Sequence, residues 1–88
     1  MKDLKNIWEQ QKGICPLTGW ELKLPDTTDG WKNPPDIRRA SLDRIDSSRP
    51  YEIGNIRFIS VIANYAKNSF TDQEVIEFCK AVSDYKSL

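Results

Sequence analysis

The sequence has no histidine and only two cysteines, Cys15 and Cys79, which are far apart and form no CxxC pair. Because a tetrahedral zinc site needs four ligands, the chain cannot supply an ordinary one. It also lacks an uncharged apolar stretch long enough to span a membrane, and residues 1–5 lack the apolar core of a secretory signal. We therefore expect a cytoplasmic protein without structural zinc, in which both cysteines are buried free thiols rather than a disulfide.

The chain has no excess of either charge, because 13 Lys and Arg balance 13 Asp and Glu. A zero net charge gives no global attraction to nucleic acid. The distribution is uneven, since residues 32–67 hold seven cations, five of them arginine, against four carboxylates. Arginine is the side chain best suited to gripping phosphate with two hydrogen bonds. Charge alone leaves two interpretations open, a phosphate-binding stretch or an ordinary solvated face.

The length of 88 residues allows one domain with one modest core. Apolar spacing and a capping box predict three helices, at residues 3–12, at residues 60–68 and from residues 71–74 onward. Two short strands are predicted at residues 40–45 and 55–59, with a turn-rich loop between them. We expect a single α+β domain over residues 1–88, with a strand, loop, strand and helix unit at residues 40–68 in its centre.

The remaining segments carry more specific expectations. Residues 14–24 hold a turn bracketed by Pro and Gly and predict a small hairpin or knuckle. Residues 25–35 predict a loop in which Trp31 either anchors to the core or is exposed for binding. The helix at residues 60–68 is expected to bury Ile59, Ile62, Ala63 and Ala66, and to expose a polar stripe of Ser60, Asn64, Lys67 and Asn68. The last helix is expected to bury Val75, Ile76, Phe78, Cys79 and Val82.

Three polar residues of the central unit have no evident structural need: Asp43 late in the first strand, Asn55 at the start of the second, and Asn64 in mid-helix. Carboxylate and amide oxygens are hard ligands that suit Mg²⁺ or Mn²⁺. If the helix packs across the strands, Asp43 and Asn64 could converge on one ion, while Asn55 could pin the long loop through its backbone. Taken singly, the three have plainer roles as an ion-pair partner, a turn cap and a solvated helix residue. Their combination favours a site.

The central unit also carries a run of short motifs, SLDRIDSS at residues 41–48, Tyr51, GNI at 54–56, IS at 59–60 and ANYAK at 63–67. With CPLTG at residues 15–19 and TDQE at 71–74, this run resembles the signature of a phage and bacterial branch of the HNH endonucleases. The resemblance covers nearly the whole chain except residues 25–35. It implies a ββα-metal fold and metal-dependent cleavage of DNA.

The resemblance also implies roles for four residues. Asp43 would match the first metal ligand, at the end of the first strand. Asn64 would match the last ligand, on the helix. Asn55 would match the central asparagine that braces the loop, and Lys67 would match a lysine that faces the DNA backbone.

One departure from the family pattern bears on the chemistry. Many HNH nucleases place a general-base histidine directly after the first ligand, where this chain has Arg44. Arginine cannot accept a proton near neutral pH, although it could hold the scissile phosphate or offset charge in the transition state. The proton would then pass to Asp46 or to hydroxide formed on the metal. Strand alternation would aim Asp43 and Arg44 at opposite faces unless the strand twists or bulges there.

The sequence therefore predicts a Mg²⁺- or Mn²⁺-dependent endonuclease that nicks DNA, as a monomer or a homodimer. Six cations are predicted to contact the DNA, namely Arg38, Arg39, Arg44, Arg49, Arg57 and Lys67. The missing histidine favours a second hypothesis, a DNA-binding module without catalysis. A third is a protein-interaction domain, which the zero net charge and an exposed Trp20 or Trp31 would suit.

Overall fold

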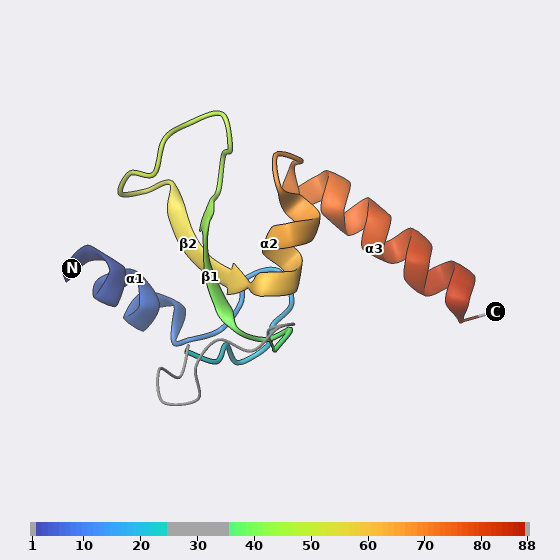
Figure 1. Ribbon diagram of the computed structural model, residues 1–88, viewed down its shortest axis with the longest axis horizontal. Coiled ribbons are helices and arrows are strands. Elements are labelled where there is room, and N and C mark those ends of the chain that lie inside the picture. Colours follow the sequence, from blue (N-terminus) through green and yellow to red (C-terminus); the bar gives the residue numbers. More distant parts are fainter. Residues whose placement is uncertain (1, 25–35, 88) are drawn as a thin grey trace.

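The computed structural model describes residues 2–24 and 36–87, and the predicted loop with Trp31 lies outside the described residues. Within those ranges the chain forms three helices and one antiparallel hairpin (Figure 1). In chain order the elements are α1 (Lys2–Gln11), β1 (Ala40–Arg44), β2 (Ile56–Ser60), α2 (Val61–Lys67) and α3 (Asp72–Lys86). The predicted α+β class is confirmed, and each predicted helix or strand is present with ends that differ by one or two residues.

Helix α1 ends where the sequence predicts, at a glycine. Gly13 has a φ of +67° and donates its backbone N–H to the carbonyl of Trp8 at 3.2 Å. A side chain there would be strained by this φ, and its Cβ would lie 3.1 Å from the Trp8 ring. The tight knuckle that follows is closed by the bond from the Gly19 N–H to the Cys15 carbonyl at 2.8 Å.

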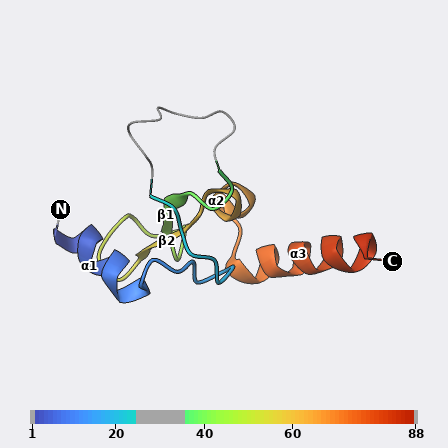
Figure 2. The ribbon, with the colours of Figure 1, turned by 90° about the horizontal axis from the view of Figure 1, so that it is seen from below.

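The hairpin and α2 form one continuous unit. β1 pairs with β2 in a register that sets Asp43 opposite Arg57 and Leu42 opposite Phe58. Ser60 is both the last residue of β2 and the N-cap of α2, with its Oγ accepting the Ala63 N–H at 3.3 Å. Because no loop separates strand from helix, α2 packs directly against the hairpin. Helices α1 and α2 lie on either side of the hairpin in both views (Figures 1 and 2).

The small core lies where the knuckle meets the hairpin and α2. Its buried members are Cys15, Leu22, Ile59 and Ala63. Trp8 packs on Phe58 edge to face, with ring centroids 5.3 Å apart. The side chain of Gln11 ties α1 to β2 by accepting the Phe58 N–H at 2.7 Å and donating to the Phe58 carbonyl at 2.8 Å.

The buried side of α2 differs from the expectation. Val61, Ala63 and Lys67 are buried, whereas Ile62 is 47% exposed and Ala66 is also exposed. The prediction from apolar spacing that Ile62 and Ala66 are buried is therefore wrong. The reason is that Lys67 finds oxygen partners inside the domain, so a polar residue takes the place expected for an apolar one.

The buried side of α3 is also much smaller than expected. Val75 is buried, but Ile76, Phe78 and Val82 are 49%, 61% and 48% exposed, and Cys79 is exposed as well. The reason is geometric, because α3 leaves the body of the domain after its first turns and extends away from the hairpin (Figures 1 and 2). Both cysteines are free thiols, but only Cys15 is buried. No described helix is both long and apolar enough to cross a membrane.

Candidate functional site

A polar depression of about 410 Å³ lies where the end of β1, the loop between the strands and α2 meet. Its lining residues are Asp43, Arg44, Tyr51, Asn64, Tyr65 and Asn68. The two residues predicted as metal ligands, Asp43 and Asn64, therefore lie on the same depression. Arg44 lies there too, although strand alternation predicted that it would point away from Asp43.

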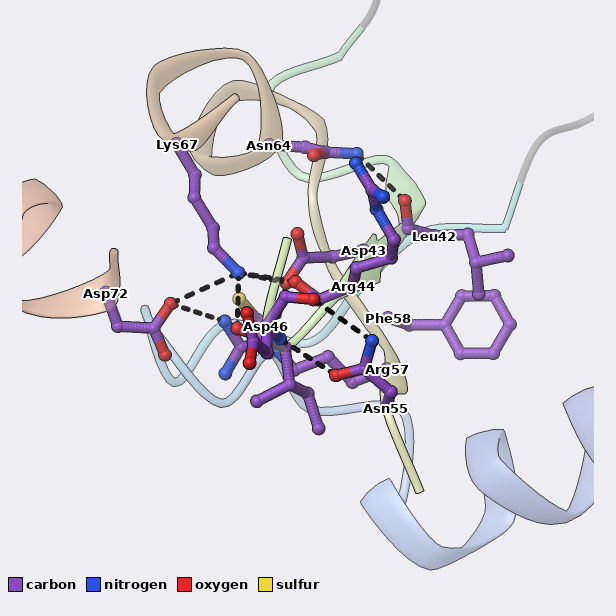
Figure 3. Close-up of polar contacts among 12 residues, drawn as sticks. Leu42, Asp43, Arg44, Asp46, Asn55, Arg57, Phe58, Asn64, Lys67 and Asp72 are labelled. Carbon is purple, nitrogen blue, oxygen red and sulfur yellow. Dashed lines mark hydrogen bonds and ion pairs between the residues drawn. The ribbon is translucent and has the colours of Figure 1, made fainter. Parts of the chain in front are cut away.

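Asp43 has one oxygen held and one oxygen free. Its side chain is 4% exposed, and Oδ2 accepts from Arg57 Nε and from Lys67 Nζ, both at 2.9 Å (Figure 3). Oδ1 has no partner among the described residues, and no fully buried side-chain oxygen in that part of the chain lacks one. Oδ1 must therefore reach the surface, where Asp43 lines the depression.

Asn64 is held in a single amide orientation. Its Nδ2 donates to Ser41 Oγ at 2.6 Å. It also donates to the Leu42 carbonyl at 3.0 Å, across from α2 to β1 (Figure 3). Because a carbonyl only accepts, this bond fixes which end of the amide is nitrogen. Oδ1 has no hydrogen-bond partner within the described ranges. Asn64 thus brings a second acceptor oxygen to the depression.

Lys67 is an internal residue, with 1% of its side chain exposed. Its Nζ donates to Asp43 Oδ2 at 2.9 Å, to the Arg44 carbonyl at 2.6 Å and to the Ile45 carbonyl at 3.1 Å, and lies 3.5 Å from Asp72 Oδ1. A buried ammonium is stable only with such compensation. The expectation that Lys67 faces a DNA backbone is therefore wrong, because the side chain points inward.

Arg57 belongs to the same internal network and not to the surface. Its side chain is 13% exposed and binds Asp43 through Nε and Asp72 through Nη2, the latter at 2.7 Å. Burial lowers the pKa of Arg57, but the hydrogen bonds to Asp72 and Asp43 raise it more, so the pKa lies above its usual value. The predicted DNA contact of Arg57 is a second correction, because two carboxylates already occupy its guanidinium.

Sequence reasoning missed Asp72. The capping box that opens α3 is present as predicted, with Thr71 and Glu74 bonded to each other in both directions. An acidic residue in a first helical turn has a sufficient local explanation in the helix dipole, so nothing in the sequence marks Asp72 as part of a site. Only the packing of α3 against α2 brings it to Arg57 and Lys67.

Asp72 makes the stability of the domain depend on acid pH. Burial raises its pKa, but the hydrogen bond from Arg57 and the charges of Arg57 and Lys67 lower it more, so the pKa lies below its usual value. A carboxyl with a lower pKa in the folded state stabilises the fold above its unfolded pKa, and this contribution is lost as pH falls through the folded pKa. We expect the free energy of unfolding to drop as pH falls below about 4, and to drop less in Asp72→Asn. Urea denaturation across pH measures both, and equal acid losses in the two proteins would contradict the assignment.

Asp46 and Asn55 lie in the loop but do not line the depression. Asp46 Oδ1 accepts from Ser48 Oγ at 2.6 Å and Ser48 N–H at 2.9 Å, and these bonds lower its pKa. Asn55, 1% exposed, accepts the Asp46 N–H at 2.9 Å and donates to the carbonyls of Asp46 and Pro50 at 3.1 and 2.9 Å. Asn55 therefore braces the loop, and Asp46 helps to shape it.

The remaining predicted cations lie nearer the surface. The guanidinium of Arg44 is 5.2 Å from the Tyr51 ring centroid and donates to the Arg49 carbonyl at 3.2 Å. The exposed side chain of Arg49 pairs with Glu52. Arg38 is exposed and stacks over Trp20 at 5.0 Å, while Arg39 is partly buried. Trp20 is accordingly partly buried.

The donor atoms on the depression fit a hard cation that keeps most of its own water. Asp43 and Asn64 each present one oxygen, and oxygen ligands suit Mg²⁺ or Mn²⁺. The part of the chain that the structure describes contains no cluster of three or more acidic, cysteine or histidine side chains that could hold a metal. An ion bound between Asp43 and Asn64 would therefore need further ligands from water or from another molecule.

Comparison with family models, with curated proteins and with solved structures finds no match for this chain.

Proposed function

We propose that this chain is a metal-dependent DNA endonuclease domain of the HNH type, with the strand, loop, strand and helix unit at residues 40–68 as its ββα-metal centre. One observation carries the proposal. A carboxylate oxygen of Asp43 and an amide oxygen of Asn64 both remain free and line one polar depression, next to the guanidinium of Arg44. The motif resemblance points to the same residues.

The roles of the side chains follow from these positions. Asp43 and Asn64 would hold the divalent ion, which when bound supplies positive charge for the scissile phosphate and the leaving oxygen. Arg44 would hold a non-bridging phosphate oxygen and offset the charge that builds on it. Asp46 is bonded to Ser48 and does not line the depression. We therefore favour the route in which no side chain accepts the proton of the attacking water. This water, with a pKa that the bound ion would lower, would release its proton to solvent.

Of the six cations predicted to contact DNA, we keep as candidates those that lie near the surface. Arg44 lies at the centre, with Arg38 and Arg49 as exposed candidates for phosphate contacts. These contacts would position the backbone without reading sequence. A domain with one such centre nicks one strand, so cutting of both strands would need two copies.

A plasmid nicking assay with Mg²⁺ and Mn²⁺ tests the proposal. We expect the parent protein to convert supercoiled plasmid to the open circle, and EDTA to abolish this. Asn64→Ala removes an ion-binding oxygen and is expected to slow nicking at least about a hundredfold, because even outer partners of metal ligands contribute 10- to 100-fold.

Asn68→Gly is the matched control. It removes an amide side chain from the same depression at a position whose φ of 42° suits glycine. It is expected to retain most of the activity. Equal activity of Asn64→Ala and the parent would reject Asn64 as a ligand, and circular dichroism of each variant separates loss of activity from loss of fold.

A DNA-binding module without catalysis is the second candidate. It is favoured by the two cations that already compensate Asp43, so that the fold needs no metal ion to neutralise this carboxylate. In that case the protein would bind DNA in a salt-sensitive way that EDTA does not change, and no nicked plasmid would form with either metal.

A further inference from the structure

The charge balance of the depression bears on how it would take up a divalent ion. Three cations, Arg44, Arg57 and Lys67, line it or bond to its carboxylate, against two carboxylates, Asp43 and Asp72. The group as a whole is therefore positive. Protein sites that bind Ca²⁺ on their own instead gather several carboxylates, whereas Mg²⁺ is usually held by one or two carboxylates together with the phosphates of a substrate.

Two further observations bear on the affinity of the depression for a lone divalent ion. Asp46, whose carboxylate is reached by the charge of Lys67, brings the sum to zero when it is included, but no lower. Asp43 also offers one oxygen only, since its Oδ2 already accepts two charge-assisted hydrogen bonds. A lone divalent ion would thus meet one free carboxylate oxygen and one amide oxygen in a region with no negative excess.

A phosphodiester would meet the opposite situation. The Arg44 side chain lines the depression and donates to one acceptor among the described residues, the Arg49 carbonyl, which leaves further N–H groups to donate. A phosphate bound there adds a negative charge and oxygen atoms beside Asp43 and Asn64. Negative charge and further oxygen ligands are what the depression lacks for binding a cation in the absence of DNA.

We propose that the divalent ion and the phosphodiester of the substrate bind this site together, and that the free protein holds the ion only weakly. This proposal rests on the proposed function, and it specifies the order in which DNA and the ion bind. The DNA strand can bind first, through Arg44, and its phosphate then completes the coordination of the ion. Lys67 and Arg57 act as positioning residues, because they hold Oδ2 of Asp43 and leave Oδ1 toward the depression.

Mn²⁺ binding followed by electron paramagnetic resonance tests this order without reference to cleavage. The signal of the free ion is titrated with the parent protein, with a short DNA duplex, and with both together while a gel shows the duplex intact. We expect no saturable site on the free protein below about 1 mM. The mixture should take up one additional Mn²⁺ per protein beyond the duplex alone, about 5- to 150-fold more tightly than the protein does alone. One Mn²⁺ bound to the free protein at micromolar concentration would overturn the proposal.

Two variants of Arg44 test the electrostatic cause. Arg44→Gln removes a positive charge from the lining of the depression and is expected to strengthen Mn²⁺ binding to the free protein by about tenfold. Arg44→Lys keeps the charge and is expected to bind Mn²⁺ like the parent. Arg44 is only partly buried, so both variants should fold. An Arg44→Gln protein that binds Mn²⁺ no better than the parent would reject the charge argument.

The two proposals fail in distinguishable ways. A parent protein that takes up Mn²⁺ only with the duplex, yet never nicks plasmid, would support the joint binding and reject the nuclease. A parent protein that nicks plasmid but binds Mn²⁺ tightly without DNA would support the nuclease and reject the joint binding.

Discussion

Asp43→Ala is expected to lower the free energy of unfolding by about 3–5 kcal/mol, because it leaves buried cations without their shared carboxylate. Lys67, 1% exposed, would keep only Asp72 at 3.5 Å as an ionic partner, and Arg57, 13% exposed, would keep only the same residue. Urea denaturation followed by circular dichroism measures the loss. For a domain of 88 residues this is a large part of the total stability.

Asp36→Ala is the matched control for this result. Asp36 also pairs with a lysine, Lys23, at 2.8 Å, but the two side chains are 43% and 62% exposed. Exposed ion pairs contribute little, so the denaturation midpoint of this variant should stay close to that of the parent. If Asp43→Ala behaved like Asp36→Ala, the internal network would not exist in solution. The comparison also matters for function, since lost nicking in Asp43→Ala has to be separated from lost folding.

Lys67→Met is expected to be the second large loss, again about 3–5 kcal/mol, although it introduces an apolar side chain of similar length. The substitution removes the donor that the carbonyls of Arg44 and Ile45 share at the end of β1. It also removes one of the two cations on Asp43. A buried acceptor that loses its donor bears the full cost of desolvation.

A double variant isolates the part due to the ion pair. Asp43→Ala combined with Lys67→Met removes both charges at once, and its loss should be smaller than the sum of the two single losses by about 0.5–3 kcal/mol. Strict additivity would show that the two side chains do not interact. Lys80→Met is the exposed control, because Lys80 pairs with Asp84 at 3.6 Å on a side chain that is 74% exposed, and it should leave the midpoint nearly unchanged.

If these predictions hold, the Asp43 side chain has two roles, one in stability and one in the proposed site. Oδ2 completes an internal network that joins β1, β2, α2 and the start of α3 (Figure 3). Oδ1 is left for the depression. Because the same residues hold the fold and orient the proposed ligand, the position of the free oxygen is set by rigid elements and not by a loop.

Much of the local structure could be predicted from the sequence, because its causes are local. Gly13 ends α1 and Thr71 opens α3 through contacts within a few residues along the chain. Apolar residues between turn signals predict the two strands, and the loop between them, residues 45–55, is too short for the crossover that a parallel pair needs. The bracing role suggested for Asn55 agrees with its bonds to Asp46 and Pro50.

What faces inward could not be predicted in the same way. A lysine in a polar helical stripe and an arginine on a short strand are normally solvated. Nothing near Lys67 in sequence shows that two strand-end carbonyls and two carboxylates lie within its reach. The exposure of Phe78 and Val82 is likewise decided by the direction in which α3 leaves α2, which apolar spacing does not encode.

The amino-acid sequence by itself thus determined the order of helices and strands, the caps, and the pair Asp43 and Asn64 as candidates for one site. The tertiary structure alone decided that Lys67 and Arg57 are internal, that Asp72 joins them, and which oxygen of each candidate ligand stays free. The physical reason is the separation along the chain of the residues that interact. Turns and caps are satisfied by neighbours in the chain, whereas a buried charge is satisfied by whatever oxygen the packing of distant elements brings near it.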